Sequence, residues 1–501
     1  MALADYYGRN ALAAAQVLAG FDEQRIREAL DNVSVGLCIG TDAAQSSEGR
    51  TLIDLLVRLL ARLYPRLAIR SEIGGRTAVE EVLNLARRIN PSMEFSSDPT
   101  VEVAVGTALP SAGDWPRIFV GSNDWNALVA TAGPRAVGSS DNPFGAGAAA
   151  CLAAANVFRW VFLQENPLLD KDLTFSVLES ELSRTGDTPL PVTLDEIVLV
   201  GAGAIGNAAA WAFSRLPMEG VLRIVDHEVI DLGNLQRYVL AERDDEGRNK
   251  VDVVARYFNG KVRAKAHALK FEDFVVSEGY LWARMMLALD SSRDRRAAQA
   301  SLPQWIANAW TQPGDLGVSS HDFLNGACVT CLYLPDHGVE NEDAIIASAL
   351  GVPNQLMQIR TLLHNGQGVP RELLDVISAA HNIPIERLLP FEGRGVRHLY
   401  TEGFCGGAVI PLGELGTPRQ EVHVPLAHQS ALSGLLLAAA AVRQALGLNG
   451  LGTQVTRINV MRTLGSDLTQ PAAKDPRGIC ICQDADYRDV YKSKYASALE
   501  A

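Results

Sequence analysis

The sequence predicts an α/β fold in which a doubly wound unit occurs twice and the second copy carries an inserted segment. Three observations support this prediction. An apolar run enters a glycine-rich turn and an alanine-rich helix at residues 197–213, a similar apolar run ends in glycine at residues 32–40, and each half closes with a proline-led, alanine-rich helix. A strand, a tight turn and a helix in this order are typical of the start of a βαβ unit.

Length and composition are those of a multidomain globular chain. At about 150 residues per domain, the 501 residues correspond to about three domains. Hydrophobic residues make up 48% and charged residues 21%, proportions that allow a buried core. The net charge of −13 argues against a nucleic-acid or anionic-membrane binder, because neutralising phosphates requires clustered lysine and arginine. We therefore expect no nucleic-acid partner and no membrane partner.

The chain has no features of export or membrane insertion. Residues 1–20 lack a basic segment followed by an apolar run and a cleavage site. Both of the longest apolar stretches contain an arginine, Arg159 or Arg443, which favours buried helices over membrane spans. The seven cysteines are an odd number, and a chain of this size needs no disulfides to fold. These observations favour a cytoplasmic protein.

The glycine-rich turn predicts a nucleotide site on a Rossmann-like unit. It has the form G-x-G-x-x-G, with glycines at Gly201, Gly203 and Gly206. Backbone N–H groups and the helix dipole at such a turn bind phosphate, and the glycines let the nucleotide approach. The next strand ends at Asp226, where a nucleotide-binding fold places its ribose ligand. By itself this motif fits dinucleotide oxidoreductases as well as ATP-dependent enzymes.

The first third of the chain looks like a weaker copy of the same unit. Its first strand ends at Gly40, but the G-x-G-x-x-G motif is missing. Residues 117–121 are expected to match residues 286–290, because each is an apolar run followed by polar residues. The closing helices begin at Pro143 and Pro425, much farther apart than the first strands, so the second copy must carry a long insertion.

These matches divide the chain into five predicted segments. They are a first copy at residues 1–169, a polar linker at 170–195, the first part of the second copy at 196–333, an insertion at 334–424 and the second part of the second copy at 425–501.

Further short motifs follow the glycine turn in a fixed order. Residues 226–230 match a D-x-[DE]-x-V motif except for Ile230 at its last position, an N-L-x-R motif runs from Asn234 to Arg237, and Lys250 and Asp290 follow. With the glycine turn, this order and spacing resemble the ubiquitin-activating superfamily, which includes the sulfur-carrier adenylators ThiF and MoeB. The resemblance covers about residues 196–296. It identifies the second copy as an adenylation domain and the first as an inactive relative of it.

Two further positions bear on this resemblance. An N-terminal Tyr-x-Arg pattern, found in the family, occurs as Tyr7 and Arg9. Glu228 is a departure, because aspartate is more usual at that position of the second motif, and we expect the exchange to be tolerated.

The resemblance implies a reaction and a role for each motif residue. In this reaction a C-terminal carboxylate attacks the α-phosphate of ATP and displaces pyrophosphate, so the protein mainly positions the reactants and neutralises charge. The implied roles are ribose binding for Asp226, phosphate binding for Asn234, Arg237 and Lys250, Mg²⁺ binding for Asp290 with Asp294 as the alternative, and an arginine finger from the first copy for Arg9.

Several of these residues also have a purely structural interpretation. Arg237 and Lys250 could be surface cations, and Asp290 could cap the helix that follows its strand. An exposed arginine near a terminus, such as Arg9, is common.

Four cysteines form two close pairs, Cys328 with Cys331 and Cys480 with Cys482. The resemblance implies a structural zinc site made of paired cysteines. The second pair is Cys-x-Cys, whose side chains would point to opposite faces of a regular strand, so this pair requires a turn. A proline and a glycine shortly before it favour that turn. The alternative is that four buried cysteines cluster without a metal.

Three cysteines remain. Cys38, in a predicted strand, and Cys151, in an alanine-rich helix, are expected in the core. Cys405 lies in the insertion beside glycines, which let a large acyl group approach its sulfur. The resemblance implies that an inserted catalytic-cysteine domain supplies the thioester nucleophile, and Cys405 is the candidate. The alternative is a buried thiol.

We therefore expect an enzyme that activates a ubiquitin-like protein, uses ATP and Mg²⁺, and contains structural Zn²⁺. It would adenylate the modifier and then hold it on Cys405 as a thioester. The expected partners are a ubiquitin-like protein ending in glycine and a conjugating enzyme, and a homo-oligomer stays open. The tail after Cys482 is too short for the ubiquitin-fold domain of eukaryotic relatives. The short, alanine-rich chain resembles bacterial ubiquitin-like conjugation systems, which are associated with antiviral defence.

Two other functions fit parts of the sequence. A ThiF/MoeB-like adenylator of a sulfur carrier, or of a peptide, would share the nucleotide site and need no thioester relay. An NAD(P)-dependent oxidoreductase would share the glycine turn, but it has no use for Asn234, Arg237 and Lys250 together.

Overall fold

The structure is a computed structural model of the 501-residue chain. It describes residues 6–7, 14, 23–71, 76–108, 113–163, 168–178, 181–182, 190–258, 260, 262–312, 314–334, 342–404, 425–448, 452–466 and 468–496. Two of the predicted site residues, Arg9 and Cys405, lie outside the described residues.

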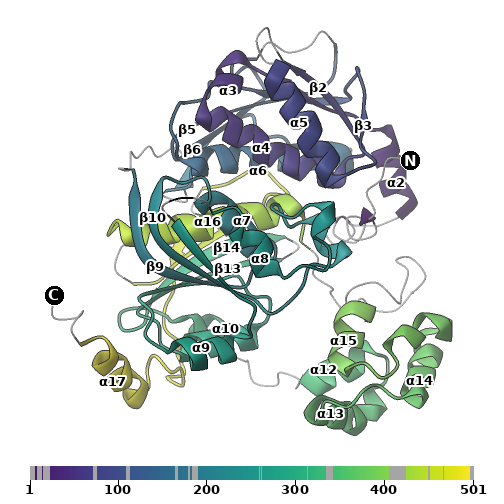
Figure 1. The fold of residues 1–501 in the computed structure, drawn as a ribbon, viewed down its shortest axis with the longest axis vertical. Helices are drawn as coiled ribbons and strands as arrows, with labels where there is room; N and C mark the ends of the chain where they lie inside the picture. The colour runs from purple at the N-terminus through teal and green to yellow at the C-terminus, as the bar shows by residue number, and fades with distance from the viewer. Residues whose placement is uncertain are drawn as a thin grey trace. The chain divides into compact units, whose positions relative to one another are not determined.

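The chain packs into two compact units. The larger one comprises Met1–Asn10, Ile26–Leu334 and Pro425–Ala501, and it contains both β-sheets (Figure 1). The smaller one comprises Ala11–Arg25 and Pro335–Val424. The predicted insertion at residues 334–424 therefore coincides with most of a separate packing unit.

The first sheet has eight strands in the order β3-β2-β1-β4-β5-β6-β7-β8. Its strands are β1 (Val35–Ile39), β2 (Arg66–Ser71), β3 (Glu94–Phe95), β4 (Val101–Val105), β5 (Arg117–Asn123), β6 (Asn126–Ala130), β7 (Asp172–Ser176) and β8 (Glu181–Leu182). The strands from β3 to β5 run parallel, and those from β5 to β8 pair antiparallel. The accompanying helices are α2 (Glu23–Asn32), α3 (Thr41–Gln45), α4 (Ser47–Leu63), α5 (Arg76–Ile89) and α6 (Pro143–Phe162).

The second sheet has the order β11-β10-β9-β12-β13-β14-β15-β16. Its strands are β9 (Val192–Val200), β10 (Met218–Val225), β11 (Val262–His267), β12 (Arg284–Leu287), β13 (Trp305–Gln312), β14 (Asp315–Asp322), β15 (Gln454–Ile458) and β16 (Thr469–Pro471). Again the strands up to β13 are parallel and those beyond it antiparallel. Its helices are α7 (Ala204–Phe213), α8 (Lys250–Ala255), α9 (Phe271–Glu278), α10 (Ser292–Ala300), α11 (Val329–Leu332), α16 (Ala427–Ala445) and α17 (Ala485–Lys494).

The two sheets share one topology, which supports the predicted repeat and corrects two of its details. Strand by strand, β4 matches β12 and β5 matches β13, so residues 117–121 do not match residues 286–290 as predicted. Neighbouring strands have similar apolar patterns, so the pattern alone paired β5 with β12, the neighbour of its true counterpart β13. The linker expected at 170–195 contains β7 and β8, which continue the first sheet, and the start of β9.

The smaller unit is helical where it is described. Its main elements are α12 (Glu342–Ala349), α13 (Leu356–Asn365), α14 (Arg371–His381), α15 (Val396–His398) and a π-helix, η6 (Leu399–Phe404). Gly366 and Asn382 end α13 and α14 in the left-handed conformation that favours these residue types. Ile346, Ile359, Leu374 and Phe391 belong to one buried core, so the unit has the hydrophobic centre of an independent domain.

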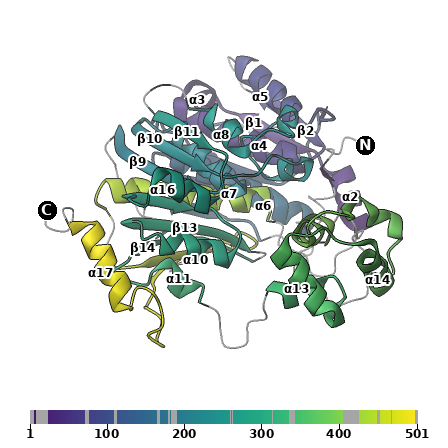
Figure 2. The same ribbon diagram turned by 60° about the horizontal axis from the view of Figure 1, so that its bottom comes forward.

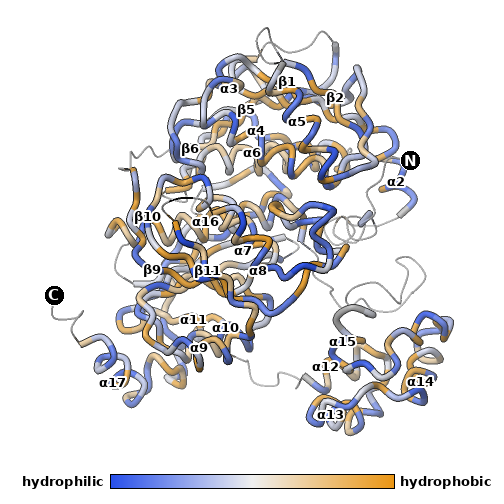
Figure 3. The backbone as a smooth tube through the Cα atoms, in the orientation of Figure 1, coloured by the Kyte–Doolittle hydropathy of each residue, from blue (hydrophilic) through white to orange (hydrophobic). Residues whose placement is uncertain are grey.

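Apolar helices pack between the two sheets. The helices α6 and α16 contact each other, and α4 packs on α6 as α7 packs on α16 (Figure 2). Figure 3 shows that the residues along α16 are largely hydrophobic. Among the described residues, α6 is the helix long and apolar enough to cross a membrane, but 94% of its apolar stretch is buried inside the protein. Arg159 and Arg443 lie on α6 and α16, as the sequence predicted for buried helices.

A buried ion pair between Arg159 and Asp170 joins the end of α6 to the backbone that follows β15. Arg159 is 1% exposed, and its Nη2 atom lies 2.6 Å from Oδ2 of Asp170. The same guanidinium donates to the carbonyls of Val460 and Arg462, which follow β15. Asp170 also accepts hydrogen bonds from Asn156 at 2.9 Å and from the backbone of the residues after β15. The pair thus links the first copy to the second.

Replacing Asp170 with alanine should lower the free energy of unfolding by about 3–5 kcal/mol, because it leaves a buried guanidinium without its counter-charge. Asp172→Ala provides the control. Its carboxylate pairs with Arg135 at 2.7 Å, but its side chain is 79% exposed, so we expect a loss below about 1 kcal/mol. Urea unfolding monitored by circular dichroism measures both, and equal effects would contradict the prediction.

Candidate nucleotide and metal sites

The predicted nucleotide residues meet at one edge of the second sheet. Gly201 directly follows β9, Asp226 directly follows β10, and Asp290 comes three residues after β12. Because β9 lies between β10 and β12, the connections leave in opposite directions on its two sides. This switch point, at the carboxyl ends of parallel strands, is where doubly wound folds bind ligands.

Each glycine of the turn has a separate physical role. Gly201 has φ +97°, and a Cβ atom there would lie 2.5 Å from the carbonyl oxygen of Ala288. At Gly206 a Cβ atom would lie 1.9 Å from the carbonyl of Gly201. Gly203 precedes α7 without a side-chain cap, and a Cβ atom there would meet only the Tyr238 hydroxyl, at 3.5 Å. The outer glycines permit tight packing, and the middle one leaves the helix N-terminus open to an anion.

Asp226 holds the glycine turn in place. Its Oδ2 atom accepts a hydrogen bond of 2.8 Å from the backbone N–H of Ala202, and its Oδ1 atom accepts one of 2.9 Å from Glu228. The carboxylate is half-buried, and each oxygen has a second lone pair that a ribose hydroxyl could use. The sequence predicted a ribose ligand here and missed this role in ordering the loop.

The N-L-x-R motif forms a short, internally capped turn. In η1 (Leu232–Gln236) the Oδ1 atom of Asn234 accepts a hydrogen bond of 3.0 Å from the backbone of Asp231, which caps the turn in return. The oxygen of Asn234 is used within the turn, and its NH₂ group is the donor that it can offer to a phosphate. Arg237 ends η1, and its hydrogen bonds to Gly233 and Gln236 are long, at 3.4 and 3.5 Å. Weakly held donors of this kind can turn toward a ligand.

Lys250 is a buried cation with a built-in counter-ion. It is 5% exposed and forms an ion pair with Glu228. Burial alone would lower the pKa of Lys250, but Tyr238, Glu228 and Asp226 together raise it above its usual range. Burial likewise acts to raise the pKa of Glu228, and Lys250 more than offsets it, so that pKa is lowered. Both groups are charged at neutral pH, and Lys250 is no surface cation.

Tyr238 lies at the centre of these groups, and the motif analysis did not single it out. It is 3% exposed, and its ring centroid lies 5.3 Å from Nζ of Lys250 and 5.6 Å from Cζ of Arg237. A cation over an aromatic face is attracted to the ring electrons. The ring therefore places both cations near the glycine turn. Its position directly after the N-L-x-R motif was the one available indication.

Asp290 and Asp294 both lie on the connection between β12 and α10. Asp290 is exposed in the loop, and Asp294 is exposed in the first turn of the helix, where its N–H bonds Oγ of Ser291 at 3.0 Å. The buried Arg295 donates to the carbonyls of Leu289 and Ala309, which holds the loop beside the sheet edge. Asp290 is the acid nearer in sequence to the strand end, and the choice between the two stays a prediction.

The N-terminal segment packs beside the same turn. Tyr6 is 3% exposed, shares a buried cluster with Ile230, Leu235 and Tyr238, and donates to the carbonyl of Ile89 at 3.3 Å. Arg9 lies outside the described residues, so its predicted finger role stays a prediction.

In the first sheet, a carboxylate of the chain itself occupies the equivalent edge. Asp42, two residues after Gly40, accepts hydrogen bonds from the N–H and the hydroxyl of Thr107 at 2.9 and 3.0 Å. Its other oxygen accepts from the N–H of Val137 at 3.1 Å. A Cβ atom at Gly106, which follows β4, would lie 2.3 Å from Oδ1 of Asp42. Two backbone donors beside this edge, the N–H groups of Thr107 and Val137, are thus already used.

The two cysteine pairs come together, as predicted. The sulfur atoms of Cys328, Cys331, Cys480 and Cys482 all lie within 4.8 Å of one another. Cys328 and Cys480 are 3.4 Å apart, and Cys331 and Cys482 are 3.5 Å apart. Sulfurs bound to one tetrahedral zinc ion at about 2.3 Å would be about 3.8 Å apart, whereas a disulfide requires about 2.05 Å. The donor set and spacing therefore fit a zinc ion.

Local structure explains how the Cys-x-Cys pair can share one centre. A turn begins at Cys480, whose carbonyl accepts the N–H of Gln483 at 2.8 Å, so the expected turn is present. The cluster lies against the buried side chains of Phe323 and Tyr491. Hydrogen bonds from Cys328 and Cys480 lower the pKa of Cys331 to about 7. A lower pKa raises the fraction of thiolate, the form that binds metal.

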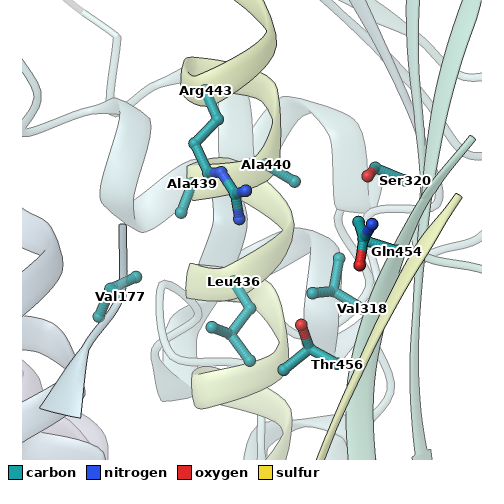
Figure 4. A pocket seen from close by; sticks show the side chains of 9 residues that line it. All are labelled: Val177, Val318, Ser320, Leu436, Ala439, Ala440, Arg443, Gln454 and Thr456. Carbon is teal, nitrogen blue, oxygen red and sulfur yellow. The ribbon is translucent and has the colours of Figure 1, made fainter. Parts of the chain in front are cut away.

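Two further features belong to other parts of the chain. In the smaller unit Arg394 and His398 contact each other at 2.8 Å, and Cys405, seven residues after His398, lies outside the described residues. In the larger unit a cavity of about 20 Å³ lies between α16 and strands β14 and β15, with Ser320 and Thr456 in its lining (Figure 4). Such a volume holds about one water molecule.

Known protein families match both copies. Residues 38–163 match Prokaryotic E2 family C, and residues 193–273 match the ThiF family. The ThiF match covers β9 to β11, whose order in the second sheet is the same as that of β1 to β3 in the first.

Solved structures that match this chain have low sequence identity to it. MccB from E. coli, with AMPCPP and MccA, aligns at 14% identity over 56% of this chain and 65% of its own, with a TM-score of 0.33. PaaA aligns at 13% identity over 55% of this chain and 64% of its own, with a TM-score of 0.29. The chain thus spans slightly less than two thirds of these structures.

Curated relatives match at higher identity. The y4jF protein of Sinorhizobium fredii is 40% identical over 100% of this chain and 98% of its own length. The Nedd8-activating enzyme E1 catalytic subunit of Drosophila melanogaster is 31% identical over 20% of this chain and 23% of its own length. The chain therefore belongs to the ubiquitin-activating superfamily, with a ThiF-family domain, and within it to the family of the y4jF protein.

Proposed function

We propose that the chain activates a ubiquitin-like protein in two steps. In the first, the modifier's C-terminal carboxylate attacks the α-phosphorus of ATP, the bond to the β-phosphate breaks, and pyrophosphate leaves. In the second, the thiolate of Cys405 attacks the acyl carbon and AMP leaves, which gives a thioester. The adenylating-enzyme fold is shared with the superfamily, and the modifier and the thioester belong to the proposal.

One observation carries the adenylation step. The open N-terminus of α7, the half-buried Asp226 and the buried Lys250 converge on the carboxyl edge of one sheet. The helix N-terminus and Lys250 would neutralise phosphate charge, Arg237 and the Asn234 amide would add donors, and Asp226 would bind the ribose. An oxidoreductase would not need these phosphate donors together.

Magnesium and zinc fit different donors of the chain. Asp290 offers a carboxylate oxygen beside the phosphate donors, the ligand that Mg²⁺ prefers when it also binds substrate phosphates. Bound there, Mg²⁺ would offset charge that builds on the phosphates. The cysteine cluster offers four sulfur ligands, which suit a structural zinc ion and leave no open coordination position for catalysis.

The first copy is proposed to be catalytically inactive. Asp42 occupies the N–H groups of Thr107 and Val137 at its sheet edge, so a negatively charged phosphate would meet a carboxylate there. A role as a conjugating enzyme, which the matched E2 family name raises, needs a reachable thiol in this region. Its cysteines, Cys38 and Cys151, are both buried, and burial raises the pKa of Cys151 well above its usual range.

Three properties of the proposal rest on sequence and chemistry alone. The partners would be a ubiquitin-like protein ending in glycine and a conjugating enzyme, and a homo-oligomer is compatible with both. The enzyme would work in the cytoplasm. A place in bacterial antiviral defence follows from the resemblance only. The competing function is a ThiF/MoeB-like adenylator of a sulfur carrier or a peptide, with no thioester relay.

Asp290→Ala should lower ATP–pyrophosphate exchange by about 10²–10³-fold, because charge on the phosphates goes uncompensated. Asp294→Ala is the matched control, since it removes an exposed acid four residues away on the same connection and should change the rate little. Exchange of labelled pyrophosphate, with circular dichroism as the folding check, decides the matter. The reverse pattern would assign the metal to Asp294.

Protein purified without chelators should contain about one zinc ion per chain, and Cys328→Ser should lower both the zinc content and the melting temperature. Cys151→Ser is the control, because Cys151 is equally buried but lies on α6 outside the cluster, so zinc should be retained. Elemental analysis and differential scanning fluorimetry measure both quantities. A stable, metal-free wild-type protein would refute the zinc site.

Cys405→Ala should keep pyrophosphate exchange and lose a reductant-sensitive adduct with the modifier, because adenylation needs only the nucleotide site. Cys38→Ser should keep both activities, since that cysteine is buried in the first sheet. Non-reducing gel electrophoresis with Mg·ATP and the modifier detects the adduct. Exchange without any adduct in the wild type would favour the competing adenylator.

A further inference from the structure

Two arginines on α4 reach from the first copy to the backbone beside the phosphate donors of the second. Arg62 is 1% exposed, and its Nη2 atom donates to the carbonyls of Tyr238 and Ala241 at 2.5 and 2.6 Å. Arg58, one helical turn earlier, donates to the carbonyl of Val239 at 2.9 Å. Three carbonyls of one four-residue segment are thus bonded from the other copy.

The segment bonded in this way continues the N-L-x-R turn. Residues 232–241 contain Asn234, Arg237 and Tyr238, and the Tyr238 ring contacts the cations of Arg237 and Lys250. On its other side the segment is tied to α7, because the N–H of Leu240 bonds Oδ1 of Asn207 at 2.7 Å. We call residues 232–241 the phosphate segment. Three of its carbonyls have partners on α4, and the N–H of Leu240 has its partner on α7.

The arrangement of charges indicates positioning more than stability. Arg58 has a carboxylate partner on its own helix, Asp54, at 3.0 Å. Arg62 points its Nη2 atom at two carbonyl oxygens. Burial lowers the pKa of Arg62 to about 10, so it stays charged at neutral pH. A buried cation is costly unless it is well hydrogen-bonded, and two hydrogen bonds from one nitrogen hold the two carbonyls at a fixed distance from α4.

We propose that Arg62 is a positioning residue of the nucleotide site: from the first copy, it fixes the backbone that presents Arg237 and Tyr238 to the phosphates. The expected effect on nucleotide binding rests on the proposed adenylation function, but the positioning of the backbone by Arg62 does not depend on that function. It gives the first copy a task although Asp42 occupies its own sheet edge.

A matched pair of variants separates positioning from general stability. Arg62→Met removes the bonds to the phosphate segment. Arg159→Met removes an equally buried arginine, also from the first copy, which bonds the carbonyls of Val460 and Arg462 far along the chain from the nucleotide residues. Both variants should lower the melting temperature. Arg62→Lys keeps the charge on a shorter side chain without the guanidinium group, so it should restore part of the Arg62→Met defect.

Two measurements test the proposal. Without nucleotide, hydrogen–deuterium exchange in residues 234–241 should become faster in Arg62→Met and not in Arg159→Met. Arg62→Met should raise the dissociation constant for Mg·AMPCPP about tenfold or more, because charged hydrogen bonds that hold the phosphate segment are lost. Arg159→Met should leave this dissociation constant unchanged. Arg62→Lys serves for both measurements if Arg62→Met does not fold.

Unchanged exchange in residues 234–241 in the Arg62 variants would overturn the proposal, as would equal effects of the Arg62 and Arg159 variants on both measurements. If the wild type does not bind Mg·AMPCPP, the proposed adenylation function fails. The hydrogen-exchange result still decides whether Arg62 positions the segment, so the two failures are distinguishable.

Discussion

Hydrogen bonds from buried arginines to backbone carbonyls are the interaction on which the larger unit depends. Arg62 and Arg58 bond the phosphate segment, and Arg159 bonds the backbone after β15, each from a helix of the first copy. Burying a guanidinium is unfavourable unless carbonyl or carboxylate oxygens replace the lost water. The cost makes the docking of the two copies specific, since any other arrangement would leave buried charges unpaired. The second copy's nucleotide edge is therefore shaped by its neighbour as well as by its own sheet.

Two copies of one topology treat the same sheet edge in opposite ways. In the second, glycines keep the N-terminus of α7 clear, and Asp226 bonds the turn from the neighbouring strand, at its side. In the first, Asp42 enters the edge itself and takes up the N–H groups of Thr107 and Val137. Backbone donors left unsatisfied in a buried crevice would be costly, so a copy without a nucleotide needs an internal acceptor. The carboxylate of Asp42, in the first turn of α3 directly after β1, meets that need for the N–H groups of Thr107 and Val137.

The sequence predicted those parts of the site that short motifs determine. The glycine turn, Asp226 and Lys250 follow from local spacing, because strand ends and helix starts place them without reference to distant contacts. The cysteine cluster was predictable because four ligands of one type in two pairs have few other uses. The strand match of residues 117–121 failed, because apolar runs in adjacent parallel strands look alike. Arg62 could not be predicted: in α4 its charge suggests a solvent-facing position, and only the docking of the second copy buries it.

Cysteine chemistry sets the division of work between the two units. In the larger unit Cys38 and Cys151 are buried in apolar surroundings, which disfavour the thiolate needed for attack on an acyl carbon. The other four lie in one cluster, where a bound metal would hold their sulfur electrons in coordination bonds. No described cysteine of that unit combines exposure with a free thiolate. A thioester relay, if the chain forms one, must therefore use the smaller unit, whose separate core lets it carry Cys405 without disturbing the nucleotide edge. Adenylation and acyl transfer would then depend on different structural units, so mutation should separate them.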